Sequence, residues 1–107
     1  MMPPHLQPVL RELKARLIES FGERLSDVRL FGSYARAEAT EDSDVDVLVL
    51  IDGLAPSEIA LVADATTRLA LETGIALASV PMATERFTPG APGRGFLREV
   101  ERDGERP

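Results

Sequence analysis

Two aspartates interrupt the most apolar segment of this chain, and they constrain its fold more than any other feature. Asp44 and Asp46 precede and enter the run VDVLVLI, which covers residues 45–51. A short apolar run bounded by polar residues predicts a buried strand. Because residues i and i+2 of a strand point to the same side, we expect both aspartates on one face of a sheet, opposite the valines.

Two carboxylates in such a setting require a partner. An unpaired carboxylate in apolar surroundings costs several kcal/mol, and two of them with Cα atoms about 6–7 Å apart repel each other. Mg²⁺ takes oxygen ligands and keeps water or substrate phosphates in its other positions, so Asp44 and Asp46 are candidate metal ligands. The alternative is a pair of solvated acids at the strand edge. An EF-hand loop is excluded, because Val47 stands where that loop needs glycine.

A second candidate binding element lies just before the aspartates. Gly32 and Ser33 follow a strand predicted over residues 28–31, and SYARAEA predicts a short helix with Ser33 as its N-cap. Glycine lets a backbone approach a ligand closely, and a helix N-terminus favours phosphate. We therefore expect Gly32 and Ser33 to bind a phosphate, assisted by Arg36. A surface ion pair is the alternative for Arg36.

The rest of the chain alternates between helical and strand patterns. Apolar spacing predicts helices over residues 8–21 and 57–73, each ended by a glycine, a third strand over 75–83, a loop over 84–93 and a final helix over 95–103. This order predicts an α/β (α+β) fold with a small mixed sheet of three or more strands flanked by helices. We expect one domain over residues 1–107, with flexible ends at about 1–7 and 104–107.

Composition excludes several classes of function. The chain has no cysteine, which excludes disulfides, thiolate metal sites and thiol catalysis. Its net charge of −6 and its aromatic content of 5% argue against tight binding of nucleic acid. No apolar run reaches the roughly 20 residues of a transmembrane helix, and the N-terminus lacks the pattern of a signal peptide. We expect a cytoplasmic protein with no membrane partner.

The stretch GSYARAEATEDSDVD resembles the signature of the nucleotidyltransferase superfamily, which is Gly-Ser, ten residues and then Asp-x-Asp. With Ala-Arg and Ser-Asp also in place, it resembles the minimal nucleotidyltransferase domains. The resemblance implies a palm similar to that of DNA polymerase β, with ATP bound through two Mg²⁺ ions. It assigns the triphosphate to Gly32 and Ser33 and the metal ions to Asp44 and Asp46, and it adds Ser43 as a nucleotide-binding candidate.

The resemblance also implies a reaction and a partner. Short members of this group often pair with a HEPN-domain protein as the antitoxin of a toxin–antitoxin system, and some transfer AMP from ATP to a tyrosine of that protein. The sequence thus predicts Mg²⁺-dependent transfer of AMP to a hydroxyl on a HEPN-type toxin, with Asp44 and Asp46 as the catalytic residues. The acceptor and the oligomeric state stay open, a homo-oligomer included.

Two positions depart from the family pattern. Ala37 stands where glycine usually follows Ala-Arg, and we expect a helical position to tolerate this change. Active members usually carry a third carboxylate on the strand beside Asp-x-Asp, whereas residues 75–83 contain no acid and Ser79 is their only polar side chain. Glu72 and Glu85 lie on either side of that strand. The departure favours an alternative function, a nucleotide-binding antitoxin that neutralises its partner by binding alone.

Overall fold

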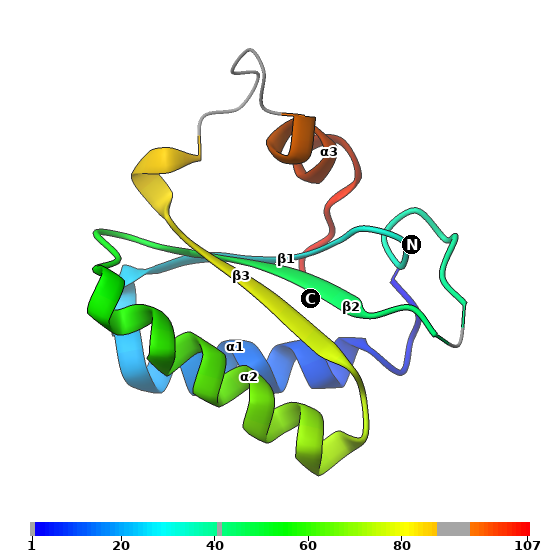
Figure 1. The fold of residues 1–107 in the computed structure, drawn as a ribbon, viewed down its shortest axis with the longest axis horizontal. Helices are drawn as coiled ribbons and strands as arrows, with labels where there is room; N and C mark the ends of the chain where they lie inside the picture. Colours follow the sequence, from blue (N-terminus) through cyan, green and yellow to red (C-terminus); the bar gives the residue numbers. More distant parts are fainter. Residues whose placement is uncertain (1, 41, 88–94) are drawn as a thin grey trace.

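Three strands form one mixed sheet in the computed structural model, which describes residues 2–40, 42–87 and 95–107 (Figure 1). β1 (Leu25–Phe31) pairs antiparallel with β2 (Val45–Ile51), and β2 pairs parallel with β3 (Leu77–Ala83). The strand order β1-β2-β3 places β2, the most apolar strand, at the centre. The predicted fold class is confirmed.

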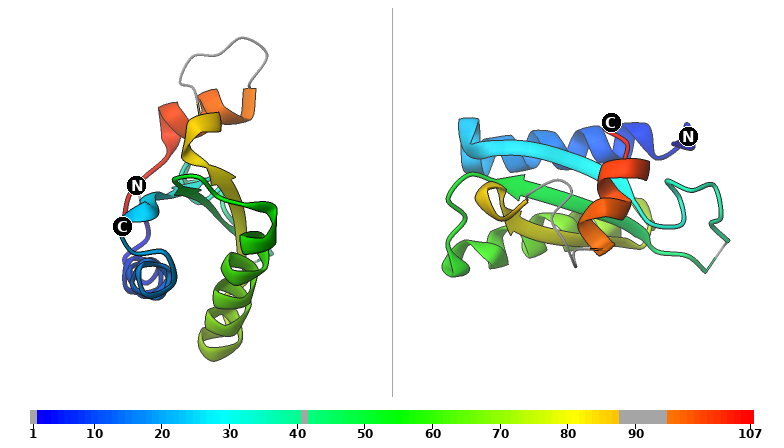
Figure 2. Two further views of the ribbon diagram at one scale, coloured as in Figure 1. Left: turned by 90° about the vertical axis from the view of Figure 1, so that its left-hand side faces the viewer. Right: turned by 90° about the horizontal axis from the view of Figure 1, so that it is seen from above.

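The helices lie on both sides of this sheet (Figure 2). α1 (Gln7–Phe21) and α2 (Ile59–Thr73) cover one face, and α3 (Gly95–Asp103) lies over the other. α1 and α2 are followed by Gly22 and Gly74, whose positive φ values of 58° and 73° suit glycine at a helix end. Both helix ends match the prediction. In the described part of the chain, no helix is long and apolar enough to cross a membrane.

The face covered by α1 and α2 holds most of the hydrophobic core. We call it the closed face. Every second residue of β2 points into it, and Val47, Val49 and Ile51 have no exposed surface. Fully burying one such side chain contributes about 1.5–3 kcal/mol. The helices supply the opposing apolar side chains Leu10, Leu13, Leu17, Val62 and Leu69.

The opposite face carries a smaller cluster, and we call it the α3 face. Phe31, Leu48 and Leu50 pack there against Val100 of α3, which is fully buried. Val100 thus lies on the apolar side of the final helix, as predicted. The side chains of Phe96 and Leu97, predicted for the same side, and most of the predicted 84–93 loop lie outside the described residues.

Both ends of the chain, which the sequence predicts to be flexible, contact the rest of the protein. At the N-terminal end Leu6 is fully buried. At the C-terminal end, the backbone groups of Glu105 and Leu30 exchange two hydrogen bonds of 2.7 and 2.9 Å. Arg106 then donates to both carboxylate oxygens of Asp27, at 3.0 and 3.1 Å. The edge of β1 is therefore covered by residues that local sequence patterns assign to a loose tail.

Candidate active site

The segment that follows β1 is a single helical turn and not the predicted helix over SYARAEA. The N–H of Arg36 donates to the C=O of Gly32 at 3.1 Å, as in an α-helix. The next N–H groups close the turn: Ala37 donates to Tyr34 at 3.3 Å and Glu38 to Ser33 at 2.8 Å. This pairing of the last two N–H groups, with a positive φ at Ala37, is the usual end of a helix.

Ala37 therefore occupies a position that favours glycine. Its φ of 58° lies in the left-handed region, and it is the one residue other than glycine with a positive φ in the described part of the chain. An alanine there costs roughly 1 kcal/mol relative to the right-handed conformation. The expectation that a helical position tolerates this change is wrong, because the turn ends at Ala37.

Gly32 joins this turn to the carboxylates. Phe31 is the cross-strand partner of Asp46, so Gly32 lies directly beside that aspartate. A side-chain carbon on Gly32 would overlap Oδ2 of Asp46, and the φ of 75° disfavours any other residue. The positive φ favours glycine at this position, and a larger side chain would displace the carboxylate of Asp46.

Asp44 and Asp46 lie at the start of β2, with the side chain of Asp46 on the α3 face. Asp44 is exposed and Asp46 is half-buried, while Val45 between them is buried in the closed face. Burial raises the pKa of the Asp46 carboxyl, the charge of Asp44 raises it further, and the charge of Arg36 lowers it. A carboxylate that is both partly desolvated and repelled by its neighbour favours a bound cation.

Arg36 makes two ion pairs. Its Nε donates to Glu38 at 3.3 Å, and its Nη1 donates to Glu99 of α3. The surface ion pair that the sequence left as an alternative is therefore present. Glu99 is a residue that sequence reasoning missed. It lies 63 positions from Arg36, and no local pattern joins the two.

The two candidate serines occupy different surroundings. Ser33 directly follows Gly32 and is half-buried, and its C=O accepts the bond that closes the turn. Ser43 belongs to the loop before β2, where its hydroxyl accepts a hydrogen bond from the N–H of Thr40 at 2.9 Å. Ser43 thus shapes the loop that leads to Asp44, while Ser33 stays beside the carboxylates.

β3 offers no third carboxylate beside the aspartates. The parallel register pairs Asp46 with Ala78 and Val47 with Ser79, so Ser79 points to the closed face. There its hydroxyl accepts a hydrogen bond from Thr66 of α2 at 3.0 Å. Ser79, the only polar side chain of this strand, therefore lies on the face away from Asp46. On the α3 face, the residues of β3 are Ala78, Val80 and Met82.

The two acids that flank β3 lie elsewhere. Glu72 belongs to α2 and pairs with Arg16 of α1 at 2.5 Å, beneath the closed face. Glu85 accepts hydrogen bonds of 2.9 and 3.2 Å from the N–H of Gly53, beyond the far end of β2 and about 20 Å along that strand from Asp46. Among the described residues, no group of three or more acids or histidines is placed to share one metal ion.

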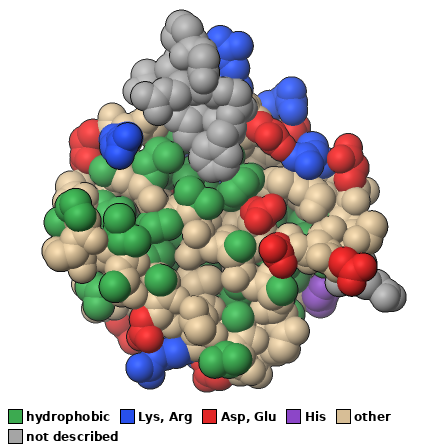
Figure 3. Space-filling model, in the orientation of Figure 1, with side chains coloured by type: hydrophobic (Ala, Val, Ile, Leu, Met, Phe, Trp, Pro, Cys, Tyr) green, Lys and Arg blue, Asp and Glu red, His purple; other side chains and the backbone are tan. Residues whose placement is uncertain are grey.

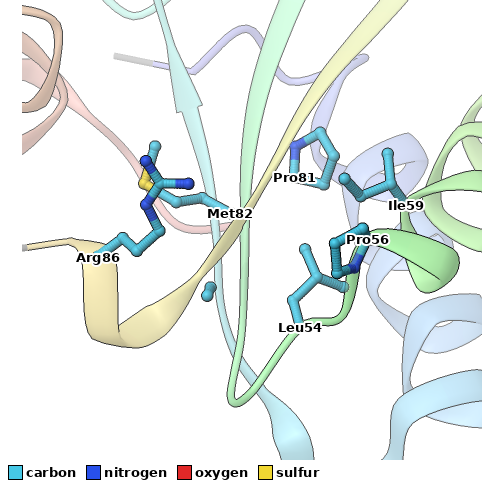
Figure 4. A pocket seen from close by; sticks show the side chains of 7 residues that line it. Leu54, Pro56, Ile59, Pro81, Met82 and Arg86 are labelled. Carbon is cyan, nitrogen blue, oxygen red and sulfur yellow. The ribbon is translucent and has the colours of Figure 1, made fainter.

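A hollow of about 210 Å³ lies at the other end of β3. It is lined mainly by apolar side chains, those of Leu54, Pro56, Ile59, Pro81, Met82 and Ala83, with Arg86 among them (Figure 4). On the surface, hydrophobic side chains gather on the left of the view and acidic ones lie to their right (Figure 3). Asp44 and Asp46 lie at the start of β2, whereas this hollow lies beside the other end of that strand.

The sequence matches the family described as nucleotidyltransferase domain over residues 10–88. A candidate protein adenylyltransferase of Methanocaldococcus jannaschii is 31% identical over 81 residues, which cover 76% of this chain and 77% of that protein. The protein adenylyltransferase MntA of Thermococcus cleftensis is 50% identical over 44 residues, but these cover only 41% of this chain and 42% of that protein.

Two solved structures resemble the fold. A candidate minimal nucleotidyltransferase has a TM-score of 0.64 at 29% identity and covers 98% of this chain and 95% of its own. A crystal structure of a toxin–antitoxin with AMP-PNP has a TM-score of 0.59, covering 88% of this chain and 68% of its own. At 22% identity, the second likeness supports the fold alone.

Proposed function

The chain belongs to the nucleotidyltransferase domain family, and from this premise we propose that it transfers AMP from ATP to a hydroxyl group on a partner protein. The observation that carries the proposal is the contact between Gly32 and Asp46, which places a candidate phosphate-binding turn directly beside the carboxylate pair. Relatives named protein adenylyltransferase support the choice of AMP and of a protein acceptor.

In the proposed reaction, the acceptor oxygen forms a bond to the α-phosphorus of ATP and loses its proton to water. The bond between the α- and β-phosphates breaks, so that pyrophosphate leaves. Gly32 and Ser33 approach the phosphates through their backbone, and Arg36 adds a positive charge beside them. The hydrogen bond from the N–H of Thr40 to the Ser43 hydroxyl shapes the loop that leads to β2. We assign no general base: Asp44 and Asp46 are assigned to the metal ion, and Arg36 engages Glu38 and Glu99.

The donor set of the site fits Mg²⁺. Mg²⁺ is commonly bound by one or two carboxylates, with waters and substrate phosphates as its other ligands. Asp46 in β2 and Asp44 just before the strand provide two carboxylates. When bound, the ion would neutralise charge on the phosphates and orient them for displacement. A second ion, as the superfamily resemblance implies, would need further ligands from the nucleotide, water or the partner.

For the partner we propose a HEPN-domain toxin, with this chain as its antitoxin. A crystal structure of the toxin–antitoxin MntA-HpeT is 25% identical to this chain, with a TM-score of 0.57. The site also opens at the surface, since Asp44 is exposed, so an acceptor side chain on another protein can approach it. We place the reaction in the cytoplasm, where ATP and Mg²⁺ are available.

A second candidate function is neutralisation of the toxin by binding alone. The specific observation in its favour is the apolar β3, which presents Ala78, Val80 and Met82 on the α3 face. A site with two carboxylates can bind a nucleotide with its metal ion and still lack the base or the second ion that fast transfer requires.

The test is intact-mass spectrometry of a HEPN-domain protein encoded next to this chain, after incubation with the chain, ATP and Mg²⁺. We expect the added mass of one or more AMP groups. Asp44→Asn should abolish the addition while the protein stays folded, because the amide keeps the shape and removes the charge that binds metal. Glu72→Gln, which breaks an ion pair beneath the closed face, serves as the matched control and should retain the addition.

Two results would contradict the proposal in different ways. Inhibition of the toxin with no added mass, with several nucleotides and with both Mg²⁺ and Mn²⁺, would establish neutralisation by binding alone. Calorimetry tests the metal ion separately: ATP should bind in the presence of Mg²⁺ and not in EDTA. Equal binding in both conditions would overturn the assignment of Asp44 and Asp46 as metal ligands.

A further inference from the structure

Arg36 links the candidate phosphate-binding turn to α3. Its own N–H completes the turn by bonding to Gly32, while its guanidinium group bonds to Glu99 of α3 through Nη1 and to Glu38 through Nε. The side chains of Arg36 and Glu99 are 30% and 36% exposed, so this ion pair lies partly out of water. The guanidinium group is thus already bound to an oxyanion in the structure.

The charges around Arg36 are unbalanced. One guanidinium group is paired with the carboxylates of Glu38 and Glu99, and its charge also acts on the carboxyls of Asp46 and Asp103, the latter paired with Arg102. A triphosphate brings further negative charge into this region. Carboxylate and phosphate oxygens bind to the same N–H groups of arginine with similar geometry, so a phosphate and Glu99 compete for Arg36.

We infer that the Glu99 carboxylate fills the position on Arg36 that a phosphate group of the nucleotide takes, and that Glu99 gives way when nucleotide binds. The inference rests on the proposed nucleotide binding and adds a residue to it. Glu99 is then a positioning residue: it orients Arg36 toward the α3 face and sets the affinity for phosphates by competing with them. The ligand class is a nucleotide with a polyphosphate chain.

Only the Glu99 side chain has to move for this exchange, because α3 is anchored independently. Val100 is fully buried against the sheet. Beyond the helix, Glu105 pairs with Leu30, and Arg106 binds Asp27, whose side chain is 11% exposed. These contacts do not involve Glu99, so its replacement should leave the helix in place. A change of affinity in a Glu99 variant can therefore be assigned to the ion pair.

The experiment is calorimetric titration of the full chain with ATP in Mg²⁺ and with adenosine, which has no phosphates. Glu99→Gln should bind ATP about two- to fivefold more tightly, the range expected from releasing a partly exposed ion pair. Its affinity for adenosine should be unchanged. Glu72→Gln removes the same charge from the Arg16–Glu72 pair beneath the closed face, and it should bind both ligands like the wild type.

The double variant separates competition from a general effect of charge. In an Arg36→Gln background, Glu99→Gln should produce no further gain in affinity for ATP, because the shared guanidinium group is gone. If Glu99→Gln raises the affinity for ATP equally in the Arg36→Gln background, the inference is overturned. It is also overturned if the wild type binds ATP and Glu99→Gln alone binds it with the same or lower affinity. If the wild type does not bind ATP, the proposed function fails. If Glu99→Gln nevertheless binds ATP, the result supports competition between Glu99 and phosphate. If neither protein binds ATP, the inference is overturned.

Discussion

The two faces of β2 differ in what they do for the protein. On the closed face, Val47, Val49 and Ile51 are fully buried beneath α1 and α2. On the α3 face, the same strand starts with the half-buried Asp46 and becomes apolar only at Leu48 and Leu50, where Val100 covers it. One seven-residue strand therefore supplies stability on one side and a candidate reaction site on the other.

The same difference separates two ion pairs between arginine and glutamate. Arg16 and Glu72 join the two helices that pack on the closed face. Arg36 and Glu99 join the turn beside Asp46 to the helix that covers the α3 face. The first pair links two helices, whereas the second involves the arginine that we propose to bind phosphate. Two ion pairs of the same residue types thus have different surroundings, because they lie on opposite sides of the sheet.

The largest expected effect on stability comes from shortening a buried side chain on the closed face. Ile51→Ala should lower the free energy of unfolding by about 3 kcal/mol, because it leaves a cavity where the side chain has no exposed surface. The melting point should fall by roughly 10 °C or more. Urea denaturation measures the change, with Leu71→Ala at an 81% exposed position as the control. ATP binding by the folded variant should match the wild type; a strong loss would mean that the two faces are not independent.

A substitution on the α3 face should change the stability less, and in the opposite direction. Asp46→Asn should stabilise the metal-free protein by about 1 kcal/mol near neutral pH, because it removes the repulsion with Asp44 at nearly constant volume. The same variant should lose ATP binding in Mg²⁺. A lower stability of the variant in EDTA would show that the Asp46 carboxylate is a structural hydrogen-bond acceptor and would weaken the assignment of the site.

The gain in stability from Asp46→Asn should also depend on pH. Burial, with the charge of Asp44, raises the pKa of Asp46 in the folded protein above its ordinary value of 3.8. As the pH rises through this window, the unfolded chain ionises first, so the wild type loses stability that the asparagine variant keeps. Below the ordinary value both states are protonated, and the two proteins should unfold at equal denaturant concentrations. A gain that persists there would exclude charge as its cause.

The smallest effect concerns the turn that carries Arg36. Ala37→Gly should stabilise the protein by about 0.5 kcal/mol, because relief of the left-handed strain exceeds the entropy that glycine loses on folding. Chemical denaturation in EDTA measures it. Ala39→Gly, two residues further on and without a positive φ, should instead leave the stability unchanged or lower it. Equal effects of the two substitutions would mean that the turn does not end at Ala37.

Local sequence patterns predicted the elements of the fold well, for reasons visible in particular residues. The glycines at 22 and 74 end both long helices as expected, and the alternation in β2 places its valines on one face. Spacing in the sequence also placed Asp46 in this strand, although Asp44 directly precedes it, and the Gly-Ser turn follows the neighbouring strand. These features depend on residues close together in the chain, where backbone geometry alone fixes the direction of the side chains.

Only the tertiary structure decided which distant residues meet. The pairing of β2 with β3 set Ala78 beside Asp46 and turned Ser79 toward α2, and a change of one residue in the register would have reversed both. The packing of α3 brought Glu99 to Arg36, and the return of the chain to β1 ordered Glu105. The sequence by itself determined the family, the strands and the carboxylate pair, because these are local patterns. The surroundings of the pair depend on strand register and helix packing, which are set by contacts between segments far apart in the chain.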